Sequence, residues 1–261
     1  MKKTSSIQIQ VLLTLFVAMF SSCWSTRTTS EFDSSVVGKY EQPCPDVPEY
    51  IDPRDSTVYR TIQIGEQCWM KENLRWLPSV SHPRDNSQIN PHYYVSRYYS
   101  NDVDEAKASV FYNLYGGLYN WPAALDACPP GWQLPSEDDF FNLTGYLINN
   151  YEEITNENVD SHLMSARKVR SSLGGVYNTR FHPRWDRRVK QHGVDSFGFS
   201  FLPGGLLTNR FFGCVGHMGI LWSNSEFDSN VAMAFSIPFI EDCQLCRGKK
   251  SFAYSVRCIK E

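Results

Sequence analysis

The stretch CPPGWQLPSEDDFFNLTGYLI, residues 128–148, carries the clearest secondary-structure signal in the chain. Ser136 can cap a helix, and the three acidic residues after it suit the positive N-terminal end of a helix dipole. Apolar residues then recur at the spacing of one helix face: Phe140, Leu143, Leu147 and Ile148. The stretch therefore predicts a helix that begins after Ser136 and packs on a core.

Short elements are predicted before this helix. Residues 57–64 and 68–70 flank a Gly65-Glu66-Gln67 turn, which is typical of a β-hairpin. Residues 120–125 suit a short helix with proline in its first turn, where a missing N–H costs nothing.

Strand patterns follow the helix. Apolar residues alternate with others in residues 197–201, 231–237 and 252–258. The last run places Cys258 on the inward face of a final strand. Strands first, helices in the middle and strands last predict an α+β domain whose chain ends come together.

Residues 1–22 have the layout of a secretory signal peptide. Two lysines precede an apolar run, residues 11–20, which is too short to cross a bilayer as a helix because that takes roughly 20 residues. The Ser21-Ser22-Cys23 sequence resembles a bacterial lipobox, in which the cysteine becomes the acylated first residue of the mature protein. We therefore predict lipidation of Cys23. A plain secretory signal, with Cys23 as a spare thiol, is the alternative.

Residues 23–44 are predicted to form the lipidated N-terminus and a flexible tether, because residues 25–35 are polar and have little to bury. Residues 45–261 then form the globular domain. Acyl chains would hold the protein at a membrane, so we expect a cell-envelope lipoprotein, in the outer membrane or facing the periplasm. Without the leader the chain has 23 basic and 28 acidic residues, a balance that gives no reason to expect nucleic acid as a partner.

Eight cysteines in an exported chain indicate disulfides before metal ligands, because thiols outside the cytosol are oxidised. With Cys23 lipidated, seven remain, so at least one stays free or pairs with another chain. The spacing of Cys243 and Cys246 suits a disulfide at the tip of the final hairpin, with a redox pair or half a zinc site as alternatives. The other pairings cannot be read from spacing.

Residues 165–191 hold eight basic side chains against one acid, the sharpest charge asymmetry in the chain. They could bind a sulfated or uronic-acid polysaccharide or lipid phosphates, with Trp185 stacking beside the guanidinium groups. A solvated loop and helix face is the alternative. The basic residues are Arg167, Lys168, Arg170, Arg180, Arg184, Arg187, Arg188 and Lys190.

No metal or cofactor is expected. Asn224, Glu226 and Asp228 offer three oxygen ligands, whereas calcium takes 6–8. Core packing by Trp222 is the favoured interpretation of this segment.

Several ordered blocks of sequence resemble the Fibrobacter succinogenes major paralogous domain over roughly residues 48–260. The blocks read DPRD (52–55), YRT (59–61), IG (64–65), WMKENL (69–74), YGGLYNW (115–121), CPPGWQLPS (128–136), FGFS (197–200), LPGG (202–205), LWSNSE (221–226) and SVRC (255–258). The resemblance implies a C-type-lectin-like fold, made of short antiparallel sheets with two or three helices and stapled by disulfides. It also implies a bond between Cys128 and Cys258. Such domains are common in exported lipoproteins of Bacteroidetes and Fibrobacter and have no established activity.

The sequence favours a non-enzymatic role in binding a glycan or a protein of the cell envelope. It contains no Gly-x-Ser-x-Gly, His-Glu-x-x-His or phosphate-binding glycine loop. Aromatic residues make up 14% of the chain, which suits sugar stacking or, more commonly, core filling. The alternative is a cysteine-dependent oxidase-type enzyme on the same fold, suggested by the odd cysteine.

Overall fold

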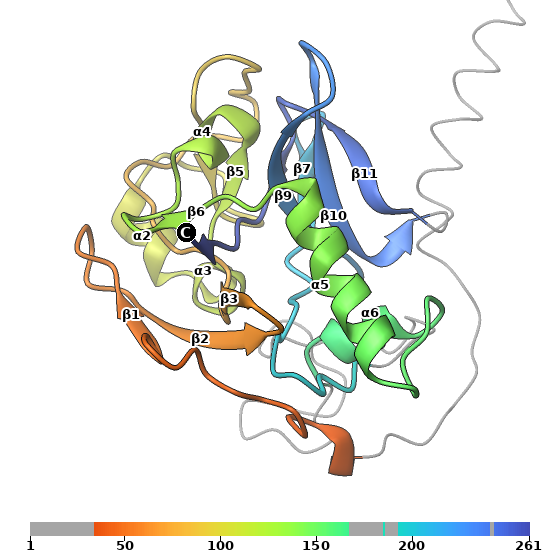
Figure 1. Ribbon diagram of the computed structural model, residues 1–261. Coiled ribbons are helices and arrows are strands. Elements are labelled where there is room, and N and C mark those ends of the chain that lie inside the picture. Colours follow the sequence, from red (N-terminus) through yellow and green to blue (C-terminus); the bar gives the residue numbers. More distant parts are fainter. Residues whose placement is uncertain (1–33, 167–184, 186–192, 241–242) are drawn as a thin grey trace, which may run out of the picture.

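The structure is a computed structural model, and it describes residues 34–166, 185, 193–240 and 243–261 (Figure 1). Its strands form three sheets. The first has the order β1 (Glu49–Ile51), β2 (Val58–Ile64), β3 (Gln67–Met70), β13 (Ile259–Lys260) and β6 (Trp132–Gln133). The second has the order β4 (Tyr93–Tyr94), β5 (Leu118–Asn120), β12 (Ala253–Tyr254), β7 (Leu206–Thr208) and β8 (Phe211–Gly213). The third has the order β11 (Cys243–Lys249), β10 (Val231–Ile240) and β9 (Gly219–Glu226).

The first sheet joins the two ends of the domain. The predicted hairpin is present, because β2 and β3 pair antiparallel with Ile64 opposite Gln67. Strand β13 inserts between β3 and β6, with Ile259 opposite both Trp69 and Gln133. The predicted α+β class, with its chain ends together, is therefore confirmed.

Helix α5 (Glu137–Asn150) begins where the sequence predicts. The Ser136 hydroxyl accepts a hydrogen bond from the Asp139 N–H at 3.1 Å, and the Asp139 carboxylate accepts one from the Ser136 N–H at 2.8 Å. This capping box satisfies donors that the first helical turn leaves open. The helix lies across β9 and β10 in Figure 1 and buries Phe140, whose ring stacks on Phe235 at 4.6 Å.

The described chain contains more helices than the two or three expected. They are η1 (Ser34–Val36), a 3₁₀ turn, and the α-helices α2 (Val103–Ala108), α3 (Val110–Tyr115), α4 (Trp121–Leu125), α5 and α6 (Val159–Leu163). Helix α4 is the one predicted over residues 120–125. Helices α2, α3 and α6 have at most six residues, too few for a periodic apolar face to be recognised. None of the described helices is long and apolar enough to cross a membrane.

The strand predicted over residues 197–201 is wrong. Asp195, Gly198 and Ser200 adopt φ angles of +48°, +73° and +52°, so the backbone turns repeatedly in the left-handed region. The Asp195 carboxylate stabilises this turn by accepting hydrogen bonds from the Ser200 N–H at 2.7 Å and the Ser200 hydroxyl at 2.6 Å. All three phenylalanines of the run are nevertheless buried. Their alternation reflects burial without a strand.

The predicted tether is too long at its C-terminal end. Residues 34–44 pack on the domain, where the Tyr40 ring stacks on Phe197 at 5.1 Å and the Tyr40 hydroxyl donates to Glu153 at 2.8 Å. Cys44 is 2% exposed. Hydrogen bonds and buried apolar surface thus hold this segment in place, and the folded part begins before residue 45.

Candidate binding surface

Two disulfides cross-link the described chain. One joins Cys128 to Cys258 across 130 residues, the pair that the family resemblance implied. The other joins Cys44 to Cys68 across 24 residues and was not foreseen, because spacing alone does not identify partners. The first bond fixes the end of the chain to the middle of the domain, and the second fixes the N-terminal segment to the β2–β3 hairpin.

The predicted bond between Cys243 and Cys246 is wrong. Both residues lie in β11, and Cys246 is not part of a disulfide. Three residues of extended strand separate their Cα atoms by about 10 Å, whereas a disulfide requires 4.4–6.8 Å. The Cys246 sulfur instead lies 3.6 Å from the Ser236 hydroxyl on β10. Cys214, half-buried after β8, is likewise not disulfide-bonded.

The predicted anionic-ligand patch falls largely outside the described residues. All eight basic residues of the patch lie outside the described ranges: Arg167, Lys168, Arg170, Arg180, Arg184, Arg187, Arg188 and Lys190. Trp185 is described, and it is 1% exposed within the core cluster that contains α5. A ring buried there cannot stack on a ligand at the surface, so the proposed part played by Trp185 is wrong.

The segment weighed as a calcium site makes structural contacts. Trp222 is buried and donates from Nε1 to the Tyr119 carbonyl at 2.7 Å. The Asn224 amide donates to the Leu134 carbonyl at 3.1 Å, and Glu226 forms an ion pair with Lys250. Within the described ranges, no three His, Cys, Asp or Glu side chains are grouped so as to hold a metal.

Aromatic side chains gather at the surface beside the Cys128–Cys258 bond. Tyr50, Trp76 and Tyr93 are half-buried and pack against the same core cluster as that disulfide. The Arg54 guanidinium lies over the Trp76 ring at 4.2 Å, and the edge of Tyr93 meets the same ring at 5.8 Å. We call Arg54, Trp76 and Tyr93 the Trp76 platform.

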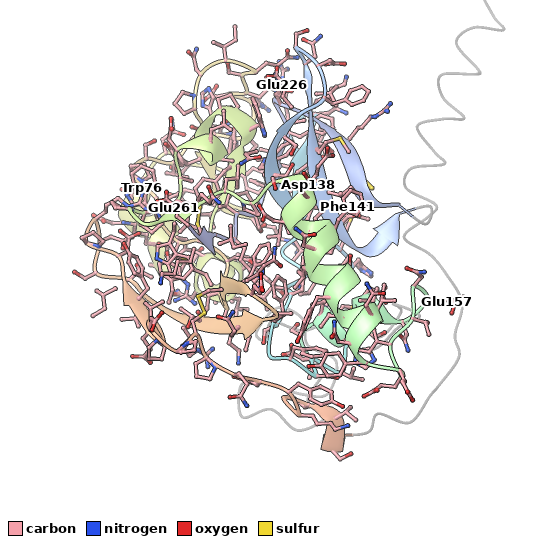
Figure 2. All side chains as sticks on the ribbon, in the orientation of Figure 1. Trp76, Asp138, Phe141, Glu157, Glu226 and Glu261 are labelled. Atoms are coloured by element: carbon pink, nitrogen blue, oxygen red, sulfur yellow. A yellow bond between two sulfur atoms is a disulfide. The ribbon has the colours of Figure 1, made fainter. Side chains whose placement is uncertain are left out.

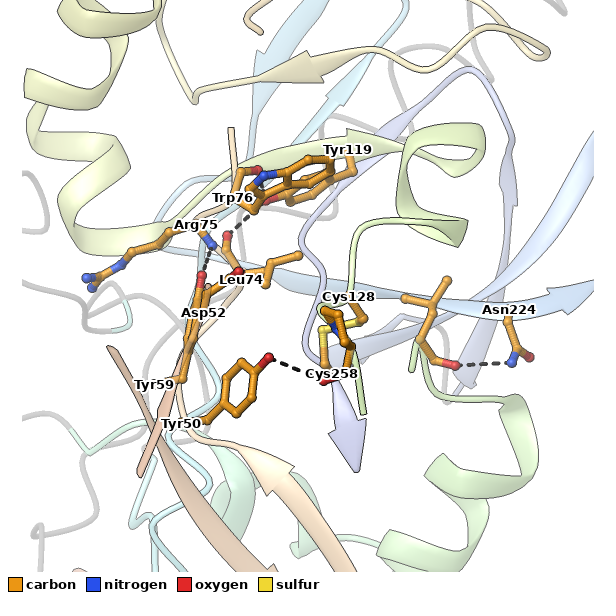
Figure 3. Close-up of a disulfide and its surroundings, with 12 residues drawn as sticks. Tyr50, Asp52, Tyr59, Leu74, Arg75, Trp76, Tyr119, Cys128, Asn224 and Cys258 are labelled. Carbon is orange, nitrogen blue, oxygen red and sulfur yellow. Dashed lines mark hydrogen bonds between the residues drawn. A yellow bond between two sulfur atoms is a disulfide. The ribbon is translucent and has the colours of Figure 1, made fainter. Parts of the chain in front are cut away.

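Buried tyrosine hydroxyls hold the backbone that carries Trp76 (Figure 3). The Tyr119 hydroxyl donates to the Trp76 carbonyl at 2.7 Å, and Tyr59 accepts from the Arg75 N–H at 2.8 Å. Tyr112 donates to the Arg75 carbonyl. Burial raises the pKa of Tyr112 to about 12 and raises that of Tyr119 well above its usual value, so both hydroxyls remain protonated donors. The position of the indole is thereby fixed.

Arg54 is held equally firmly. Its Nε and Nη2 donate to the two carboxylate oxygens of Asp52 at 2.9 and 2.7 Å, and Asp52 is fully buried. Burial favours the protonated carboxyl, but the hydrogen bonds from Arg54 outweigh this and lower the pKa of Asp52. The DPRD block thus forms a turn that lays a guanidinium on Trp76.

Such a surface can bind a flat ligand with polar edges. The exposed part of the indole offers an apolar surface, and the guanidinium over its ring and the hydroxyl of Tyr93 offer hydrogen bonds. Sequence reasoning did not find this site. The DPRD block and the aromatic content were its only signals, and neither reveals that residues 54, 76 and 93 meet.

A polar groove of about 570 Å³ lies elsewhere, beside the Cys44–Cys68 bond. Four carboxylates line it, those of Asp46, Glu66, Asp139 and Glu261, together with Lys260 and three glutamines. No aromatic ring contributes to this lining. It therefore lacks the stacking surface that the Trp76 platform has.

Fold and surface define a disulfide-linked α+β domain with a rigid aromatic platform at one edge. The chain belongs to the Fibrobacter succinogenes major domain family, whose model matches residues 62–260. No curated protein and no solved structure matches it.

Proposed function

We propose that this protein is an exported, membrane-anchored lipoprotein whose domain binds glycans without catalysing a reaction. The leader and the Ser-Ser-Cys23 sequence support removal of residues 1–22 and lipidation of Cys23. The anchor would hold the domain in the cell envelope of a Bacteroidetes-type bacterium, at the outer membrane or facing the periplasm. Short antiparallel sheets and the Cys128–Cys258 bond support a C-type-lectin-like architecture.

The observation that carries the glycan proposal is the rigidity of the Trp76 platform. Binding orders the groups it engages, so a side chain that is already fixed gives up less entropy on binding a ligand. Three tyrosine hydroxyls fix the backbone of residues 74–76, and a buried ion pair fixes Arg54 on the indole. Trp76 is half-buried with Arg54 over its ring, and the part of the indole that stays exposed is suited to contact the apolar face of a pyranose ring.

A glycan array tests this proposal. The mature chain carrying Cys23→Ala, which removes the lipid, would be applied beside its Trp76→Ala variant. We expect wild-type binding to at least one glycan and a loss of about tenfold or more in Trp76→Ala, since truncating a tryptophan that anchors an interface typically costs about 2 kcal/mol or more.

Phe141→Ala is the matched control. Phe141 is 54% exposed on α5, and Figure 2 shows it on the other side of the molecule from Trp76. The Phe141→Ala variant should bind glycans as the wild type does. Binding that is absent from every glycan, or that survives Trp76→Ala unchanged, would refute the proposal. Intact mass of the native protein checks the lipid on Cys23 separately.

A further inference from the structure

We infer that the Trp76 platform selects uncharged sugars over uronic or sulfated ones. This inference rests on the proposed glycan binding and adds the class of ligand. It follows from the charges around the indole and from the hydrogen-bonding groups that remain available there.

The one cation of the platform is already neutralised. Arg54 donates two hydrogen bonds to Asp52. Asp52 is fully buried, so no cation from solvent can replace Arg54 as its partner. An arriving carboxylate would therefore meet a pair of zero net charge. It could not use the Nε–Nη2 edge of the guanidinium for two-point binding, because Asp52 already occupies that edge.

The neighbouring basic side chain points elsewhere. Arg75 donates from Nη2 to the Asn113 carbonyl, and Figure 3 shows its guanidinium directed away from the Trp76 ring. Burial lowers the pKa of His92, next to Tyr93, so this imidazole is neutral at pH 7. Neither group adds positive charge to the platform.

Two carboxylates near the platform have no cationic partner within the described chain. Asp126, at the end of α4, is exposed and raises the pKa of Tyr93, second to the effect of burial. Among the described residues, Asp55 accepts a hydrogen bond only from the Thr57 N–H. After the larger effect of burial, its charge also raises the pKa of Tyr59 and of Tyr112. Arg54 acts on the pKa of Tyr93 in the opposite sense to Asp126, but Arg54 is paired with Asp52, so Asp55 and Asp126 are the charges left without an ion-pair partner here. A like charge on the ligand should therefore weaken binding.

The available hydrogen-bonding groups match hydroxyls. Neither the Tyr93 hydroxyl nor Trp76 Nε1 donates a hydrogen bond to any residue that the structure describes, and the Nη1 of Arg54 is uncommitted too. Asp126, close enough to act on the pKa of Tyr93, adds a carboxylate acceptor. A sugar hydroxyl both donates and accepts and so suits this mixed set, whereas a carboxylate or sulfate group only accepts and cannot donate to Asp126.

The test compares pairs of ligands that share a sugar backbone and differ chiefly in charge. The Cys23→Ala chain would be titrated with methyl-esterified and de-esterified hexagalacturonate, and with dextran and dextran sulfate, at low and high salt. In each pair that binds, we expect the uncharged form to bind about threefold to tenfold more tightly at low salt, and high salt to narrow the gap.

Two variants test whether the charge of Asp126 causes the preference for uncharged ligands. Asp126→Asn should reduce the preference, whereas Asp138→Asn, an exposed acid at the start of α5, should leave it unchanged. Equal or tighter binding of the anionic forms overturns this inference and leaves the proposed function standing. Failure of every probe and of the whole glycan array overturns both.

Discussion

Removing each disulfide separately should destabilise the domain by different, calculable amounts. The Cys128–Cys258 bond closes a loop of 130 residues, and the Cys44–Cys68 bond closes one of 24. The two loops do not overlap in sequence, so each bond restricts its own part of the unfolded chain. Their effects on the free energy of unfolding should therefore be nearly additive.

The loop lengths set the magnitudes. A cross-link lowers the entropy of the unfolded chain in proportion to the logarithm of the loop length, which gives about 5 kcal/mol for the longer loop and about 3.5 kcal/mol for the shorter. Cys44, Cys68 and Cys258 are all buried, so loss of packing adds to both values in a similar way. The difference of about 1.5 kcal/mol between the two disulfides is therefore the better test, because the similar packing contributions cancel in it.

Urea unfolding of two variants measures this difference. We expect Cys128→Ala/Cys258→Ala to lose more stability than Cys44→Ala/Cys68→Ala, with a lower midpoint in urea. Dithiothreitol should bring the wild type below either variant. If the 24-residue bond proved as important as the 130-residue bond, or more so, the entropic argument would fail for this protein, and native-state packing would have to explain the result.

Three further outcomes follow from individual side chains. Burial raises the pKa of Asp160 from 3.8 to about 6, so the neutral carboxyl that suits its buried site is lost as pH rises through 6. Asp160→Asn should therefore add about 3 kcal/mol to the free energy of unfolding at pH 8 and nothing at pH 3, as measured by thermal denaturation. An equal gain at both pH values would contradict this. Ser136→Ala removes the cap of α5 and should cost about 1 kcal/mol in urea unfolding, while Ser136→Asp should cost much less. Tyr119→Phe removes the donor to the Trp76 carbonyl and should weaken glycan binding severalfold at 25 °C while the domain stays folded by circular dichroism; unchanged affinity would show that the clamp does not position the indole.

Local signals predicted the local structure well. The capping residue located the start of α5 to the residue, and the glycine turn located the β2–β3 hairpin. These features depend on neighbours in sequence. Alternation was less reliable, because Phe199 is buried in a turn held by Asp195. A buried side chain gives the same pattern whether or not its backbone belongs to a strand.

Long-range geometry was beyond the sequence. Cys44 and Cys68 pair because the N-terminal segment packs beside the β2–β3 hairpin, and no spacing rule states this. The Trp76 platform likewise joins a turn before β2, a loop after β3 and strand β4. Only the family resemblance carried long-range information, and it supplied the Cys128–Cys258 pair and no ligand.

The insertion of β13 between β3 and β6 has a consequence for biogenesis. A ribosome or a secretion channel releases a chain from its N-terminus, so the middle of this sheet stays open until residues 259–260 emerge. Contacts between distant parts of a chain also form slowly. Completion of this sheet must therefore wait for the last residues of the chain, and such a delay would suit the export that we propose.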